Sequence, residues 1–170
     1  MYVYLMQALF LQAFDTDELR QIMDLFQSQQ LGKNELFLTE GKVCKEVAFI
    51  ESGAFTLSET IQDGKEKILD FFTSGSFLAD YYSFLQNTPA TTNIRAHRAS
   101  SLLVITKSDI DQLYERFPRF QQIGRVLAEG AFIRLADKLK SGYLNPLARY
   151  QKLLHEKPEV FEVFPQYMIA

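Results

Sequence analysis

The sequence has 170 residues, of which 47% are hydrophobic, enough to bury one sizeable core. Its formal net charge of -3 comes from 18 Lys and Arg against 21 Asp and Glu, so the chain as a whole has no basic excess for gripping nucleic acid. The single cysteine, Cys44, excludes an intramolecular disulfide, a four-thiolate iron–sulfur cluster and a zinc site built on clustered thiolates. Such cysteine usage fits a reducing, cytoplasmic setting.

The chain opens with an apolar segment that leads into a helix. Residues 1–14 lack the basic region and cleavage site of a signal peptide and are too short to cross a bilayer, so we expect a core-facing segment. Asp15, with Glu18 three residues later, matches a capping box. Apolar residues between Leu19 and Phe26 then recur at helical spacing, which predicts an amphipathic helix.

From about Leu31 to Ile105 the pattern changes to short runs of β-branched and aromatic residues. These runs are separated by the turn signals Glu40-Gly41, Ser52-Gly53, Asp63-Gly64 and Ser74-Gly75. Turn signals about 8 to 12 residues apart predict many short antiparallel strands closed as a sandwich, barrel or jelly roll. The fold class is therefore mainly β with flanking helices.

Helical periodicity returns at Lys107. The run KSDIDQLYERF predicts a short helix, and Pro118 suits the first turn of a second, long one. The apolar stripe of this long helix either folds back on the β module or pairs with its twin in a symmetric dimer, and periodicity favours neither alternative. The residues expected at such a dimer interface are Ile123, Leu127, Gly130, Ala131 and Arg134.

The last part of the sequence begins with turn residues and a further helix near Leu147 to Glu156. Its final apolar run, YMIA, opens an element that we expect to be incomplete. The expected organisation is a β module with an N-terminal helix over residues 1–113, the long helix over 114–142, and the beginning of another helical unit over 143–170.

The order of these parts resembles the Crp/Fnr superfamily of bacterial transcription regulators. The resemblance is carried by GKNELFLTEGKVCKEVAFIESGAFTL, by DGKEKILDFFTSGSFLAD and by the loop GSFLADYYSFLQNTPATTNIRAHRA. It implies a cyclic-nucleotide-binding jelly roll (a double-stranded β-helix), a dimer formed through the long helix, and a winged helix-turn-helix that reads DNA. Residues 143–170 are then the front of that DNA-binding domain, without its recognition helix.

The same resemblance implies a ligand loop in which backbone amides and an Arg hold the cyclic phosphate and a carboxylate holds the ribose. This sequence has Ala79-Asp80 where the family has Gly-Glu, and Ala90-Thr91 where it has Arg followed by Ser or Thr. A desolvated phosphate needs a cation, so we expect cyclic AMP binding to be weak or absent. Arg95 is a candidate replacement, although its strand side chain need not point inward.

An uncharged or differently shaped ligand is an alternative for this loop. Thr91, Thr92, Tyr81 and Tyr82 carry hydroxyl groups and rings that could line such a pocket. Strand propensity explains the threonines more simply, and aromatic packing under the loop explains the tyrosines.

The sequence contains no recognisable catalytic constellation, so we expect no enzyme activity. Its two histidines, His97 and His155, lie in different segments, which argues against a cupin-type metal site, and no cofactor is predicted. The expected function is a DNA-binding transcriptional regulator with a degenerate nucleotide pocket. The alternative is a stand-alone ligand-binding or protein-interaction module that does not bind DNA. The expected partners are a second copy of the chain and DNA, the latter in the full-length protein and not through this chain alone, with no membrane.

Overall fold

The computed structural model describes residues 14–61 and 64–169. The apolar start predicted to face the core therefore lies outside the described residues, apart from Phe14. The chain divides into two compact units, unit 1 ending at Ile123 and unit 2 beginning at Gly124, and each is described by itself.

Unit 1 begins with helix α2 (Thr16–Met23), where the sequence predicted an amphipathic helix. The predicted capping box is confirmed, because Asp15 Oδ1 accepts a hydrogen bond from the Glu18 amide at 2.9 Å and Glu18 Oε2 accepts one from the Asp15 amide at 3.0 Å. Ile22, on the apolar side of α2, is fully buried.

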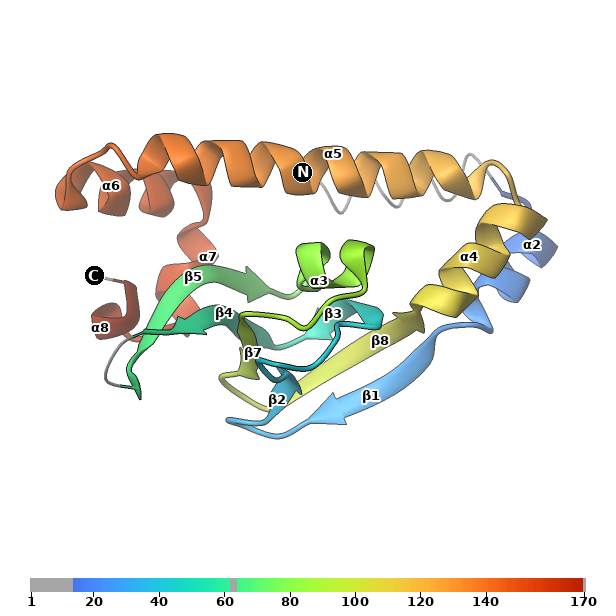
Figure 1. Cartoon of the computed structure of the whole chain (residues 1–170), viewed down its shortest axis with the longest axis horizontal. Coiled ribbons are helices and arrows are strands. Elements are labelled where there is room, and N and C mark those ends of the chain that lie inside the picture. Colours follow the sequence, from blue (N-terminus) through green and yellow to red (C-terminus); the bar gives the residue numbers. More distant parts are fainter. Residues whose placement is uncertain (1–13, 62–63, 170) are drawn as a thin grey trace. The chain divides into compact units, whose positions relative to one another are not determined.

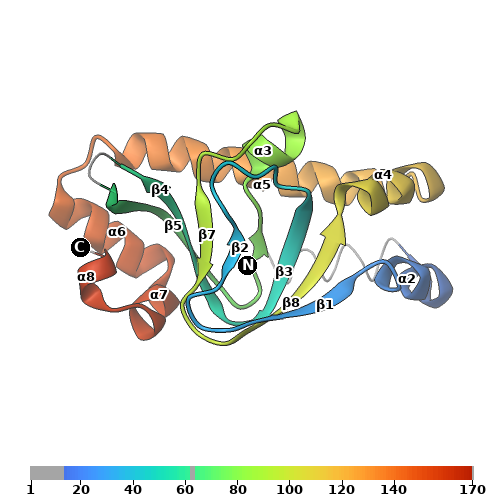
Figure 2. The same ribbon diagram turned by 60° about the horizontal axis from the view of Figure 1, so that its bottom comes forward.

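The strands of unit 1 form two four-stranded antiparallel sheets among the described residues (Figure 2). The first has the order β1-β8-β3-β6 and the second the order β2-β7-β4-β5. Their bounds are β1 Gln27–Leu31, β2 Leu36–Leu38, β3 Glu46–Ser52, β4 Ala54–Thr60, β5 Glu66–Thr73, β6 Phe77–Leu78, β7 Asn93–Ala96 and β8 Ser100–Thr106. The predicted jelly roll is confirmed.

Alternation along β4 and β7 separates an apolar face of the second sheet from a polar one. Phe55 pairs with Ala96 and Leu57 with Ile94, which places these side chains on one face. Phe55, Ala96 and Ile94 are fully buried and belong to the core of the roll. Thr56 on β4 pairs with Arg95 on β7, one residue along each strand from these positions. The side chains of Thr56 and Arg95 therefore share the opposite face of the sheet.

The turn between β3 and β4 requires glycine. Gly53 has φ +141°, and a Cβ atom there would lie 2.2 Å from Ser100 Oγ. The Ser52-Gly53 turn signal therefore reflects both backbone conformation and close packing against β8.

Two helices follow β8, as Figure 1 traces. Helix α4 (Lys107–Arg116) begins after Thr106, whose hydroxyl accepts a hydrogen bond from the Asp109 amide at 3.1 Å. Helix α5 (Phe120–Ser141) is the predicted long helix, and the boundary between the units lies within it. Its first turn belongs to the core of unit 1, where the Phe120 ring packs against Tyr114 at a centroid distance of 5.9 Å.

Unit 2 holds the rest of α5 and three shorter helices, α6 (Pro146–Glu156), α7 (Pro158–Val163) and α8 (Gln166–Ile169). The Asn145 side chain caps α6 by accepting from the Ala148 amide at 2.9 Å, and Tyr150 of α6 packs edge-on against Phe161 of α7. The helix predicted near Leu147 to Glu156 is thus present. Among the described helices, none is long and apolar enough to cross a membrane.

Candidate functional site

The candidate site is the segment of residues 79–92 between β6 and β7, here named the α3 loop because it contains helix α3 (Tyr81–Gln86). Asp80 is the N-cap of this helix, and its Oδ1 accepts a hydrogen bond from the Ser83 amide at 3.0 Å. The helix ends at Asn87, which adopts a left-handed conformation with φ +54°. The predicted short helix near Ala79 is therefore formed.

The carboxylate predicted to contact a ribose is used inside the loop. Asp80 Oδ2 accepts a hydrogen bond from Thr92 Oγ1 at 2.6 Å, while Oδ1 caps α3. Asp80 thereby ties the start of the α3 loop to its end. The structure brings together two of the predicted site residues, Asp80 and Thr92, and joins them to each other.

Ala90, the position at which the sequence resemblance predicts a missing phosphate-binding Arg, holds a buried methyl group. Ala90 is 4% exposed, and its backbone pairs with the chain before β3: the Ala90 amide donates to the Lys42 carbonyl at 2.9 Å, and the Ala90 carbonyl accepts from the Gly41 amide at 2.8 Å. Ala79 is also buried, whereas Thr91 and Tyr82 are exposed. Tyr81, the remaining predicted residue of the loop, is half-buried.

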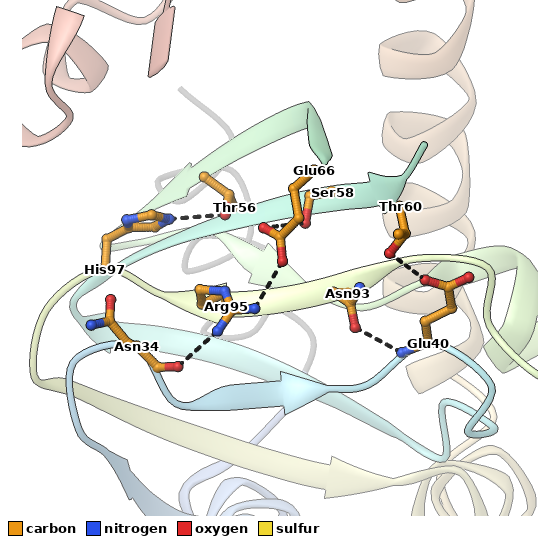
Figure 3. Close-up of polar contacts among 9 residues, drawn as sticks. All are labelled: Asn34, Glu40, Thr56, Ser58, Thr60, Glu66, Asn93, Arg95 and His97. Carbon is orange, nitrogen blue, oxygen red and sulfur yellow. Dashed lines mark hydrogen bonds and ion pairs between the residues drawn. The ribbon is translucent and has the colours of Figure 1, made fainter. Parts of the chain in front are cut away.

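Arg95 does not join the α3 loop. Its Nη2 donates to Glu66 Oε1 at 2.8 Å and its Nη1 to the Asn34 carbonyl at 3.1 Å, as Figure 3 shows. The register of β7 places Arg95 on the polar face of the sheet and its neighbour Ile94 on the core face. The guanidinium group is therefore held on the opposite face of the sheet from the core.

Separate hydrogen bonds between side chains cover the rest of that polar face (Figure 3). Glu40 accepts from the Thr60 hydroxyl at 2.7 Å, and Ser58 donates to Glu66 at 3.3 Å. His97 Nε2 lies 3.0 Å from Thr56 Oγ1. Burial, followed by the positive charge of Arg95, lowers the pKa of His97, which favours the neutral imidazole.

Ser83 is a structural residue of the loop that the sequence did not indicate. Its hydroxyl accepts a hydrogen bond from the Cys44 amide at 2.9 Å and donates one to the Thr88 carbonyl at 2.6 Å. A small hydroxyl residue between aromatic residues in the run YYSFLQ is the signal that could have suggested it, because a buried hydroxyl needs partners.

Lys107 is a second residue that the sequence did not indicate. From the first position of α4, its Nζ donates to the carbonyls of Phe84 and Leu85 at 2.9 and 3.3 Å and lies 5.5 Å from the centre of the Phe84 ring. A cation is favourable at carbonyls that end a helix. Lys107 therefore connects the α3 loop to α4.

The residues predicted for a dimer interface lie along α5 with different exposures. Ile123 is 2% exposed and Gly130 is buried, while Leu127, Ala131 and Arg134 are half-buried. The large apolar residues of α5 that are exposed lie elsewhere on the helix: Phe132, Ile133, Leu135 and Leu139. In the described part of the chain, no three His, Cys, Asp or Glu side chains are grouped to hold a metal ion.

Comparison with known proteins identifies a domain family for unit 1. Residues 28–117 match the family model of the cyclic nucleotide-binding domain. A search of curated proteins finds no significant match.

Solved structures share the fold at low sequence identity. The catabolite activator protein of Thermus thermophilus is 20% identical with a TM-score of 0.63, over 88% of this chain and 72% of that chain. The c-di-GMP responsive global regulator CLP of Xanthomonas campestris is 18% identical with a TM-score of 0.68, over 85% of this chain and 74% of that one. A CooA mutant from Carboxydothermus hydrogenoformans is 18% identical with a TM-score of 0.59, over 85% of this chain and 93% of that one.

Proposed function

The chain belongs to the cyclic nucleotide-binding domain family, and from this membership we propose that it acts as a DNA-binding transcriptional regulator of the Crp/Fnr type whose sensor roll does not bind cyclic AMP. The observation that carries the sensor part is the use of Asp80. Its two carboxylate oxygens bond to Ser83 and Thr92, and the α3 loop offers no Arg at position 90. A cyclic phosphate would lack a charge-assisted hydrogen bond, which contributes about 1.5–3 kcal/mol.

The regulator part of the proposal is supported by the arrangement of the chain. The fold shared with two regulators covers 85% or more of this chain, so it extends beyond the roll into the helices that follow it. Charge is also divided unevenly. Unit 1 holds 11 Lys and Arg against 16 Asp and Glu, whereas unit 2 holds seven against five. The positive excess that DNA binding needs is thus on the helical unit.

A route for a signal runs through α4 and α5. Lys107 ties the α3 loop to the beginning of α4, and α5 follows α4 after a short turn. A ligand that binds one arrangement of the α3 loop better than another would shift α4 and α5 and, in a dimer, the two DNA-binding units. The exposed apolar residues of α5 supply a surface for the second copy.

The test of the DNA-binding part uses protein expressed from the intact reading frame, including any residues after Ala170. Duplexes selected from a random pool are titrated by fluorescence anisotropy at several salt concentrations. We expect one sequence to be preferred at physiological salt, with log K falling linearly against log salt concentration. A folded dimer that binds selected and random duplexes equally would refute the proposal.

The sensor part is tested separately by isothermal titration with cyclic AMP. We expect no measurable heat at micromolar concentrations. A micromolar dissociation constant would show that Arg95 or backbone amides suffice to hold the phosphate, and that the internal use of Asp80 does not close the site.

One observation favours a second candidate function, a ligand-binding or protein-interaction module without DNA binding. The acidic excess of unit 1 disfavours contact between the roll and nucleic acid. The DNA titration separates the two candidates, because a module of this kind would retain its dimer and fold yet show no preferred duplex.

A further inference from the structure

A cavity of about 320 Å³ lies in unit 1 between β2 and the chain that leads into β3. It is lined by the residues from Leu36 to Thr39 and from Lys42 to Glu46. Small-molecule sites range over roughly 300–1,000 Å³, so the volume suits a small ligand. None of the lining residues belongs to the α3 loop.

The lining combines an apolar part with a small net positive charge. Leu36, Phe37 and Val43 supply apolar surface. Lys42 and Lys45 are exposed and make no side-chain hydrogen bond or ion pair within the described residues, and Glu46 supplies one carboxylate. Two ammonium groups and one carboxylate leave one unit of positive charge.

The net positive charge of the lining favours a ligand with one negative charge. A monoanion would balance it, whereas a phosphate dianion would leave an excess negative charge beside Glu46. Burial raises the pKa of the Cys44 thiol, which therefore stays neutral and adds no charge to the lining. A carboxylate with a small apolar body matches the charge and the apolar lining together.

The segment of residues 42–46, here named the bridge segment, forms one wall of this cavity and is hydrogen-bonded on both sides. Toward the α3 loop, the Cys44 amide donates to Ser83 Oγ at 2.9 Å and the Lys42 carbonyl accepts from the Ala90 amide at 2.9 Å. Toward α4, the Lys45 carbonyl accepts from the Lys107 amide at 2.8 Å. A ligand in the cavity would thus contact a segment that is hydrogen-bonded directly to the α3 loop and to α4.

We propose that this cavity is an effector site for a small carboxylate with an apolar body, distinct from the α3 loop, and that its occupation alters the α3 loop through the bridge segment. The site does not depend on whether the protein binds DNA. It supplies a place for an effector in a chain whose α3 loop is closed on itself.

The probe for this site is benzoate, with benzamide as a neutral molecule of the same shape. The ¹⁵N-labelled full chain is titrated at millimolar concentrations and followed by two-dimensional NMR. With benzoate we expect saturable shifts at residues 36–39 and 42–46, and smaller shifts at 81–92. With benzamide we expect weaker binding at the same residues, because the charge interaction is absent.

Variants test whether the lysines and the cavity itself are responsible. Two exposed ion pairs together strengthen binding about fivefold. The double variant Lys42→Gln/Lys45→Gln should therefore raise the benzoate dissociation constant about fivefold. The matched variant Lys33→Gln/Lys65→Gln removes two exposed lysines outside the cavity and should leave the constant unchanged. Thr39→Phe places a ring in the cavity while keeping both lysines and should abolish binding.

Three results would overturn the inference. Benzoate shifts that are absent, or that centre on residues outside the cavity, would remove the site. Equal binding of benzamide would remove the role of the lysines. Saturable shifts at 42–46 with none at 81–92 would remove the coupling to the α3 loop.

Discussion

Arg95 and Glu66 form an ion pair, 2.8 Å between Nη2 and Oε1, that joins the two strands flanking β4. Ser58 of β4 is fully buried and donates to the same Glu66 carboxylate. Arg95 is thus a residue that holds the second sheet together, and its charge is already balanced by a neighbour.

Replacing Arg95 should therefore affect stability and not nucleotide binding. Because both side chains are about a third exposed, we expect Arg95→Met to lower the free energy of unfolding by about 0.5–1 kcal/mol. Urea unfolding of Arg95→Met, Glu66→Gln and the double variant gives the coupling energy of the pair. A measurable change in a cyclic AMP titration on replacing Arg95 would show instead that the guanidinium reaches the α3 loop.

Asp80 should act as a structural residue of the α3 loop. Asp80→Ala removes both the N-cap of α3 and the acceptor of the Thr92 hydroxyl, and we expect it to destabilise the fold by about 1–2 kcal/mol. Thr92→Val is the matched control, since it removes only the hydroxyl and keeps the cap, and should cost about 1 kcal/mol. Equal losses in the two variants, measured by urea unfolding, would mean that the cap contributes nothing.

Lys107 should control the local stability of α3. Lys107→Met keeps an apolar stem but removes the ammonium group that bonds the Phe84 and Leu85 carbonyls. A loss of about 1 kcal/mol would raise amide hydrogen exchange in residues 81–87 about fivefold. Lys65→Met is the control, because it replaces an exposed lysine outside the α3 loop and α4. It should leave exchange in residues 81–87 unchanged. Unchanged exchange in α3 of Lys107→Met would rule out the connection between α3 and α4.

His97 should make stability depend on pH. Burial lowers the pKa of His97 below 6.5, aided by the charges of Arg95 and Lys33 and opposed by Glu66. The unfolded chain therefore binds a proton at a higher pH than the folded chain. The free energy of unfolding is highest above pH 6.5 and falls as the pH drops below this value toward the folded pKa.

Urea unfolding between about pH 5.5 and 7.5 measures this effect, because most carboxylates titrate below that window. We expect His97→Gln to flatten the profile while preserving a hydrogen bond to Thr56. His155→Gln, which replaces the other histidine, in α6, is the matched histidine variant measured beside it. A slope that persists in His97→Gln would assign the effect to another group.

Local patterns in the sequence were enough to predict the roll and the helices around it. The capping box at Asp15 and Glu18 acts within four residues, and turn glycines such as Gly53 answer a local backbone need. The capping box does not depend on what packs nearby, whereas Gly53 meets a local backbone need in addition to its close contact with Ser100. The short helix of the α3 loop could likewise be predicted by matching short segments, while the assignment of a nucleotide-contact role to Asp80 and of a missing Arg to Ala90 stays a prediction.

What the sequence could not supply is how those side chains are used. Whether Arg95 points to the core or away from it depends on a single step of strand register. The contacts of Ser83 with Cys44 and of Lys107 with Phe84 join residues 39 and 23 positions apart. Such partners become neighbours only after the roll has closed, so no local pattern announces them.

The last prediction is which face of α5 forms the interface of the proposed dimer. Phe132, Leu135 and Leu139 are 71%, 56% and 65% exposed and follow one another at helical spacing, so they share a face. This face lies about a third of a turn round the helix from Leu127, which is half-buried. Exposed leucine and phenylalanine side chains on one helix face are typical of a surface that a partner covers.

We expect Leu135→Asp to give monomers in sedimentation equilibrium, because a carboxylate buried in an apolar interface loses its hydration without a partner. Leu127→Asp separates the two faces of the helix. If the pairing runs through Phe132, Leu135 and Leu139, Leu127→Asp should leave the dimer in place and lower its unfolding temperature instead. Monomers from Leu127→Asp with an intact dimer in Leu135→Asp would move the interface to the face of Ile123 and Leu127, which belong to the interface residues predicted from the sequence. An unmodified chain that sediments as a monomer would remove α5 as a dimer surface altogether, since the exposed face would then need no second copy.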